Sequence, residues 1–286
     1  MKEQFPDIPT DILIAKALST SAENEDEYWE YIRSLHVRGS KGVLQAACKL
    51  CNSSSNKEKI TGADILAQLG VPKRTYPKEA LKTLHKLIKQ KNLDIQVLNS
   101  TLVAIGHTQE ADNSYGLNQI IQLSTHSHED VRLGVVMALW GHEDPDSINT
   151  LVALTRDNNS KVRDWATTGI GSIIDTDTEE IRLALWERVE KENREDDSDT
   201  YWEALMGLAA RKDPKINKEI LKNLLSEDPS SLIFEAASEL GEQQFLKPME
   251  ILLEKAQSEE DISEPWINRL KDSIEIIKNH NKVINA

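Results

Sequence analysis

The sequence contains few of the features that mark secreted or membrane-bound proteins. Its 286 residues include only two cysteines, which is typical of a reducing compartment. No stretch approaches the roughly 18 consecutive apolar residues of a membrane span. The N-terminal residues lack a basic run followed by an apolar stretch, so they do not resemble a secretory signal. We therefore expect a cytoplasmic protein that has no membrane partner.

Basic residues are also scarce relative to acidic ones. There are 34 lysines and arginines against 48 aspartates and glutamates, and the formal net charge is -14. Because non-specific nucleic-acid binding depends on neutralising phosphates, this charge predicts no nucleic-acid partner. A protein with a basic face would instead be attracted to such a surface.

Aromatic residues make up only 5% of the chain, and alternating runs of valine, isoleucine and threonine are rare. Apolar residues recur instead at helical spacing. The sequence therefore predicts an all-α fold.

One pattern returns along the chain at intervals of 31 to 38 residues. The stretches "DVRLGVVMALWG" from Asp130 and "KVRDWATTGIGS" from Lys161 align with each other and with three more divergent stretches. The aligned positions are Val97, Val131, Val162, Thr200 and Leu232. A second apolar helix pattern precedes each stretch, so each unit is predicted to be two helices, and such pairs bury their apolar faces by stacking.

The two clearest units are "LSTHSHEDVRLGVVMAL" (123–139) and "LVALTRDNNSKVRDWATTGIGSI" (151–173). Each has an apolar first helix, an acidic turn, Val-Arg, and then small residues at core spacing. This pattern resembles the HEAT repeat. The resemblance implies a right-handed α-α superhelix, a solenoid of about six or seven antiparallel helix pairs. The order of the units is also similar to a group of bacterial HEAT-repeat proteins that have no assigned chemistry.

We expect a single solenoid domain over residues 1–286. Repeats are predicted over 40–245, with capping helices at 1–39 and 246–286, because terminal repeats must face water. The charged run 190–200 is predicted to be a linker between two helices of one repeat.

A helical wheel assigns roles to the residues of 160–173. Val162, Ala166, Gly169, Ile170 and Ile173 share one face, which we predict to be the core. Arg163 and Trp165 lie on its flanks, and Asp164, Thr168 and Gly171 point away. The resemblance to HEAT repeats implies that Arg163 bonds an acidic turn residue such as Asp157 or Asp130. Trp165 is predicted to pack against an adjacent second helix.

The outward positions of the second helices carry large apolar residues where polar ones are usual. Such a patch predicts a binding surface, and methionine with tryptophan suits an adaptable groove. We predict a concave strip that binds a peptide or helix of another protein with a basic or amphipathic segment. Its predicted residues are Leu133, Met137, Trp140, Asp164, Thr168, Trp202, Met206 and Phe234.

Two kinds of motif in the sequence are also found in metal or redox sites. His-Glu pairs occur at 128–129 and 142–143, and deoxyhypusine hydroxylase, a HEAT-repeat enzyme, holds iron with such pairs. Here both pairs are predicted to lie in turns, with cap or turn roles. The "CKLC" stretch at 48–51 has no second ligand pair nearby in the sequence, so Cys48 and Cys51 are predicted to be buried thiols. We therefore expect no catalytic residue, metal site or cofactor.

Two enzyme classes built on similar repeats remain as alternatives. DNA alkyl-base glycosylases use a tryptophan-lined surface and an aspartate, and bilin lyases use short two-helix units. Either would use the same strip of this chain. Asp164 is the main titratable residue that the sequence places on this strip. Since catalysis needs several such residues together, the binding hypothesis is favoured.

Overall fold

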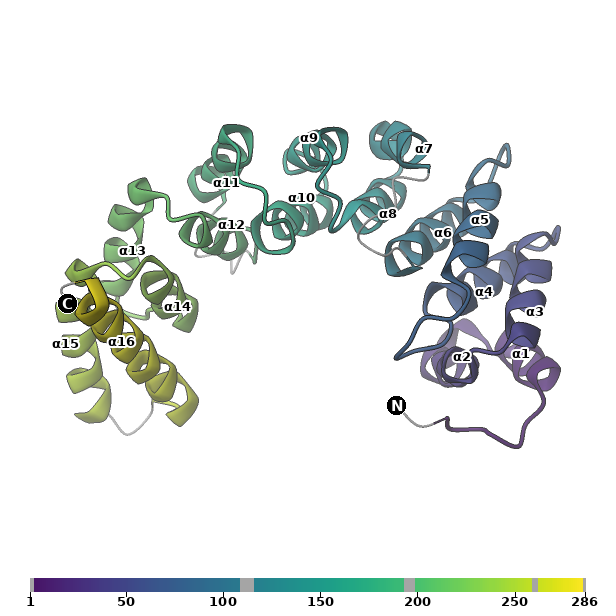
Figure 1. The fold of residues 1–286 in the computed structure, drawn as a ribbon, viewed down its shortest axis with the longest axis horizontal. Helices are drawn as coiled ribbons and strands as arrows, with labels where there is room; N and C mark the ends of the chain where they lie inside the picture. Colours follow the sequence, from purple (N-terminus) through teal and green to yellow (C-terminus); the bar gives the residue numbers. More distant parts are fainter. Residues whose placement is uncertain (1–2, 109–115, 193–198, 259–261, 285–286) are drawn as a thin grey trace. The chain divides into compact units, whose positions relative to one another are not determined.

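The computed structural model describes residues 3–108, 116–192, 199–258 and 262–284, and within these it contains helices and no strand. The chain divides into two compact units, residues 1–165 (unit 1) and 166–286 (unit 2). Helix α10 (Ser160–Thr168) crosses the boundary. The predicted all-α solenoid class is confirmed (Figure 1).

Unit 1 is built of consecutive helix pairs, whose first helices are odd-numbered and second helices even-numbered. Its helices are α1 (Thr10–Ser19), α2 (Glu25–Arg38), α3 (Lys41–Cys51), α4 (Asn56–Ala67), α5 (Pro77–Ile88), α6 (Ile95–Thr108), α7 (Leu117–Gln122), α8 (Glu129–Leu139), α9 (Pro145–Leu154) and the start of α10. Helices α2, α4, α6 and α8 pack in sequence against one another, so the second helices form a continuous layer.

Unit 2 repeats this arrangement. A five-residue π-helix, η3 (Gly169–Ile173), continues α10. It is followed by α11 (Glu179–Lys191), α12 (Asp199–Ala210), α13 (Asn217–Leu224), α14 (Ser231–Leu240), α15 (Leu246–Ser258) and α16 (Glu264–Ile284). Here too the second helices α12, α14 and α16 pack against one another. The described residues hold eight pairs, more than six or seven, because each predicted cap is itself a helix pair.

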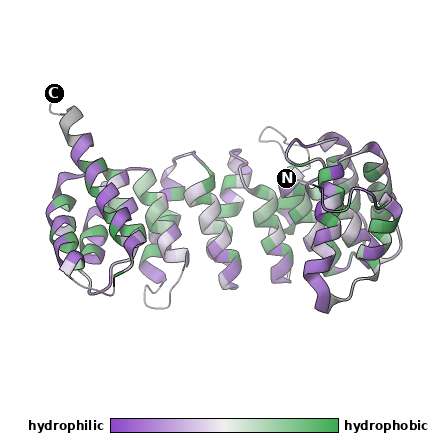
Figure 2. Cartoon of the chain, turned by 90° about the horizontal axis from the view of Figure 1, so that it is seen from below, coloured by the Kyte–Doolittle hydropathy of each residue, from purple (hydrophilic) through white to green (hydrophobic). Residues whose placement is uncertain are grey.

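Local sequence signals set the helix starts. Helix α9 begins at Pro145, whose missing N–H costs nothing at this position, and the Asp144 side chain accepts a hydrogen bond from the Ser147 N–H at 3.0 Å. Thr178 caps α11 in the same way by accepting from the Ile181 N–H at 3.3 Å. Green and purple segments lie along most helices in Figure 2, as expected for helices with one apolar face.

The predicted core positions in 160–173 are correct except for the last one. Val162, Ala166 and Ile170 are fully buried. Ile173 was also predicted to be core, but it is 42% exposed, and Ile174 is buried in its place at 2%. The cause is the wider turn of η3, where the Ile174 N–H donates to the Gly169 carbonyl at 3.1 Å, five residues earlier.

Arginines hold the turns that precede the second helices. Arg132 donates from Nη1 to the carbonyls of His126 at 2.8 Å and Ser127 at 3.1 Å. Arg163 occupies the same position in the next repeat and donates to the carbonyls of Asp157 and Asn158 at 3.0 and 3.3 Å. The predicted contact of Arg163 with the acidic turn is therefore confirmed, through the backbone of Asp157.

The Asp157 carboxylate joins two successive repeats. Arg132 of the preceding repeat donates to it from Nε at 2.6 Å and from Nη2 at 2.8 Å. Burial alone would raise the pKa of Asp157. The bonds from Arg132 and from the Asn159 N–H nevertheless leave that pKa below its ordinary value. The pair is therefore a largely buried, bidentate ion pair of the kind that contributes most per contact.

Asp157→Asn is expected to lower the free energy of unfolding at pH 7 by about 2 kcal/mol, because it removes the charge that Arg132 pairs with. Since folding lowers the pKa of Asp157, this stabilisation is present above the unfolded pKa of about 4 and is lost as the pH falls through the folded value. Urea unfolding at pH 7 and pH 3 measures both effects.

Asp177→Asn is the matched control for this experiment. Asp177 also accepts two bonds from one arginine, Arg182, but its side chain is 40% exposed, so its loss should cost less than about 1 kcal/mol. A larger loss for Asp177→Asn than for Asp157→Asn would contradict the assignment.

Glycines let second helices approach closely in unit 2. A Cβ added at Gly207 of α12 would lie 2.7 Å from the Gly171 Cα, which is too close for any real contact. Gly171 was predicted to point away from the core, but it is buried in this contact with α12. The absence of side chains at these two positions sets the spacing of the layer.

Gly207→Ala should therefore destabilise the protein by about 1–3 kcal/mol through overpacking. Gly42→Ala in α3 is the control, because its nearest neighbour would be 3.7 Å away. It should be neutral or stabilising by up to about 1 kcal/mol. Thermal unfolding of both variants tests the difference, and equal melting temperatures would show that the close approach is not required.

Candidate peptide-binding surface

Helix α8 presents Leu133 and Met137 at its surface as predicted. The wheel anchored at Val131 is correct, since Val131 and Val135 are fully buried. Leu133 and Met137 are half-buried. Trp140 is also half-buried and ends the helix as its C-cap residue. Three of the predicted strip residues thus lie on one helix with part of each side chain accessible.

Two indoles form a contact at the end of unit 1, which we call the aromatic pair. The rings of Trp140 and Trp165 lie 5.2 Å apart between centroids and are tilted by 47°. The Trp140 Nε1–H donates to the Trp165 carbonyl at 3.2 Å. Trp165 is 38% exposed. The prediction that Trp165 packs against an adjacent second helix is confirmed, and the contact leaves indole surface accessible.

Asp164 and Thr168 are both half-buried on α10, and each interacts with other parts of the protein. Trp202 and Met206 are half-buried on α12 of unit 2. The Trp202 ring packs edge-on against Tyr201 at 5.0 Å. Asp164 belongs to unit 1, and the other three residues belong to unit 2. The role of these four residues in partner binding stays a prediction.

The expectation that Phe234 lies on this surface is wrong. Phe234 is completely buried, and its ring packs edge-on against Trp266 of α16 at 4.8 Å. The physical reason is the helix register, because Ile233 and not Leu232 occupies the fully buried position. A shift of one residue rotates every side chain by about 100°.

The corrected register of α14 reveals residues that the sequence analysis missed. Glu235 and Glu239 follow Ile233 by two and six residues, which are the positions of Leu133 and Met137 after Val131. Both line a pocket of about 450 Å³ in unit 2, which we call the acidic pocket. Asp175, Met206, Arg211 and Ser238 also line it. The sequence signal for them was a charged residue two and six positions after Ile233. Anchoring the helical wheel at Leu232 concealed this signal.

A half-buried carboxylate joins three second helices of unit 1. Asp64 of α4 accepts hydrogen bonds from the Tyr28 hydroxyl of α2 at 2.6 Å and from the Ser100 hydroxyl of α6 at 2.7 Å. Burial raises the pKa of Asp64, although both hydrogen bonds oppose this. The backbone carbonyl of Asp64 lies 2.8 Å from His36 Nε2, and burial lowers the pKa of His36 to about 4.

Because folding raises the pKa of Asp64, its charged form weakens the fold. Stability from this group is highest below the unfolded pKa of about 4 and falls as the pH rises through the folded value. Asp64→Asn keeps a polar side chain between Tyr28 and Ser100 without the charge. The variant should gain stability relative to wild type as the pH is raised from 4 to 7.

Urea unfolding of both proteins across this range measures the difference, and the wild type corrects for the titration of His36. A difference that is independent of pH, or that has the opposite slope, would contradict the raised pKa of Asp64.

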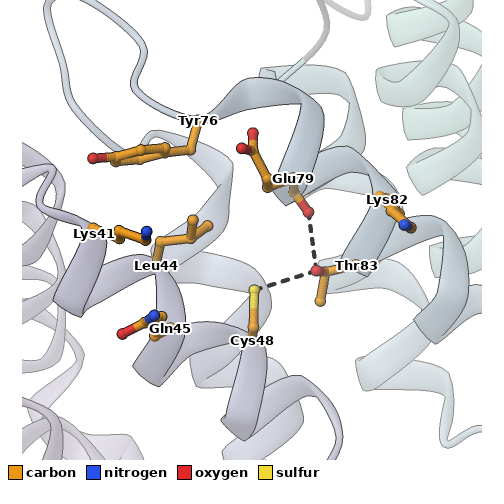
Figure 3. Close-up of a pocket in the computed structure, with 8 residues that line it drawn as sticks. All are labelled: Lys41, Leu44, Gln45, Cys48, Tyr76, Glu79, Lys82 and Thr83. Carbon is orange, nitrogen blue, oxygen red and sulfur yellow. Dashed lines mark hydrogen bonds between the residues drawn. The ribbon is translucent and has the colours of Figure 1, made fainter.

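A second pocket, of about 650 Å³, lies between α3 and α5 in unit 1. Figure 3 shows Tyr76 and Lys41 at one side of it and Cys48 beside Thr83. The Cys48 sulfur lies 3.2 Å from Thr83 Oγ1. Cys51 is buried, as predicted, and burial raises the pKa of its thiol to about 12. Cys48 is half-buried instead.

The histidines of the two His-Glu pairs lie beside helix α8. His128 is the N-cap of α8 and accepts from the Asp130 N–H at 3.3 Å, so its predicted cap role is confirmed. His142 is buried in the turn after α8, and burial lowers its pKa. Within the described ranges, no group of three or more histidine, cysteine or acidic residues could hold a metal ion.

The charged run 190–200 lies mostly at 193–198, outside the described residues. Among the described residues, no helix is both long and apolar enough to span a membrane.

The comparison with known families agrees with this architecture. Residues 117–196, which contain α7 to α11, match the family model for HEAT repeats. Residues 117–196 of this chain are therefore HEAT repeats. The match covers the two units that carry the repeat pattern most clearly in the sequence, around Val131 and Val162.

Two relatives are similar to this chain over most of its length. The chain is 27% identical over 251 residues to Protein YibA of Escherichia coli strains K12 and O157:H7, which is 84% of each chain. The X-ray structure of E. coli YibA superposes with a TM-score of 0.69 at 22% identity, over 94% of this chain and 93% of that one. An engineered protein gives a TM-score of 0.56 at 17% identity, over 94% and 78%. These structures share the fold.

Proposed function

We propose that this HEAT-repeat protein is a non-catalytic scaffold that binds a helix or extended segment of another protein. The observation that carries the proposal is the aromatic pair of Trp140 and Trp165 on the second helices of unit 1. Its indoles are held in place by their own contact and by the bond from Trp140 Nε1, yet Trp165 remains 38% exposed. Rigid, partly exposed tryptophans supply much of the affinity at protein interfaces.

The neighbouring side chains support binding over catalysis. Leu133 and Met137 are half-buried on the same helix as Trp140, and methionine adapts its shape to a bound apolar side chain. Leu133, Met137 and the aromatic pair offer contact area and no titratable group. An enzyme, in contrast, needs acids, bases or nucleophiles that converge on its substrate. The net charge of -14 favours a partner with basic residues. As part of this proposal we place the protein in the cytoplasm.

The test begins with a photo-reactive benzophenone amino acid at Leu133. Irradiation in a lysate of the source organism should link it to a defined protein, which is then identified by mass spectrometry and purified. The same group at Leu183 of α11, which is 56% exposed, serves as the control for non-specific capture.

Met137→Asp should then weaken the affinity for the purified partner at least tenfold, an effect of about 1.4 kcal/mol or more. Leu183→Asp should leave the affinity unchanged, and circular dichroism checks that both variants fold. Two results would overturn the proposal. One is equal capture of the same proteins from both positions, and the other is unchanged affinity in a folded Met137→Asp variant.

A further inference from the structure

The acidic pocket of unit 2 has walls that are fixed by buried contacts. Arg211, which directly follows α12, donates to the carbonyls of Ile170 at 2.7 Å and Ile174 at 2.8 Å, so it ties the end of η3 to the end of α12. The Gly171–Gly207 contact brings the same two elements together. A pocket with such walls does not have to be assembled when a ligand arrives, which reduces the entropic cost of binding.

The charges that line this pocket favour a cation. Asp175, Glu235 and Glu239 contribute carboxylates, and among the described residues Arg211 is the one basic residue of the lining. The Arg211 guanidinium is buried and directed to backbone carbonyls. The hydroxyl of Ser172, which also lines the pocket, donates to the Glu203 carboxylate at 2.9 Å.

Two basic residues near the pocket rim pair with Glu235 and Glu239 at exposed positions. Arg269 contacts Glu235 at 3.1 Å, and Lys212 contacts Glu239 at 3.6 Å. All four side chains are at least 43% exposed, and ion pairs of this kind contribute little. An incoming cation can therefore replace either partner at small cost.

The pocket also has an apolar side. Met206 of α12 lines it, and the long stems of lysine and arginine pack well on such a surface while their charged ends reach polar groups. A methionine beside carboxylates thus suits an aliphatic stem that ends in a positive charge. An inorganic cation would use the carboxylates and leave the methionine unused.

We propose that the acidic pocket binds a lysine or arginine side chain of a partner's peptide segment. Its stem lies on Met206, and its charged end bonds the carboxylates of Glu235 and Glu239. This inference rests on the proposed function in one respect, that the protein binds a segment of another protein. It adds a specificity site in unit 2 that selects a basic residue in that segment.

The test uses a phage library of random 15-residue peptides selected on three purified proteins. These are wild type, the pocket variant Asp175→Asn/Glu235→Gln/Glu239→Gln, and a control variant Glu227→Gln/Asp228→Asn/Glu254→Gln. The control removes the same three negative charges from exposed positions of unit 2 that do not line the pocket. Wild type and control should enrich peptides with lysine or arginine, and the pocket variant should lose this enrichment.

One enriched peptide is then made with its basic residue replaced by norleucine, and affinities are measured by fluorescence anisotropy. The replacement should weaken binding to wild type by about tenfold or more and change binding to the pocket variant by less than twofold. If the pocket variant melts below wild type, the double variant Glu235→Gln/Glu239→Gln replaces it, because both side chains are exposed.

The outcomes separate the two proposals. Enriched peptides without basic residues, or basic enrichment that persists in the pocket variant, would overturn the pocket assignment and leave the scaffold proposal standing. Failure of all three proteins to enrich any peptide would overturn both.

Discussion

The stacking of this protein depends on arginine side chains that donate to backbone carbonyls of neighbouring turns. Each short turn leaves carbonyls without helical partners, and these must be satisfied where the turn is covered. Arg132 bonds two such carbonyls and the Asp157 carboxylate of the next repeat. In unit 2, Arg182 similarly bonds Asp177 and the carbonyl of Arg211. A planar group with five donors can serve two repeats at once, which lysine cannot do.

Much of the fold could be predicted because its signals are local. Prolines after aspartates mark the starts of α9 and of the turn before α13, and the anchor positions Val97, Val131 and Val162 are all fully buried. The errors arose where packing changed the helical geometry. Ile173 is exposed because a π-helix rotates it away from the core. The residue types at 169–173 do not predict a π-helix.

The candidate surface could be predicted only where the sequence defined the helix register without ambiguity. Leu133, Met137 and Trp140 lie where the wheel anchored at Val131 puts them. On α14, two adjacent apolar residues, Leu232 and Ile233, both fit the anchor, and contact with α16 decides between them. Hydrogen-bond networks between repeats could not be predicted from the sequence. Tyr28 and Ser100 each lie 36 residues from Asp64, and nothing in the sequence pairs them.

The π-helix at 169–173 shows how a second helix can accommodate one additional residue. A π-turn holds one residue more than an α-turn, so it absorbs an extra residue without a loop and without breaking the contact of Gly171 with Gly207. Side chains beyond that point turn to a new face while the helices keep their neighbours. An insertion or deletion of one residue in a second helix could thus exchange the side chains that line a pocket such as the acidic one. The spacing of the units, which ranges from 31 to 38 residues, is compatible with such changes in length.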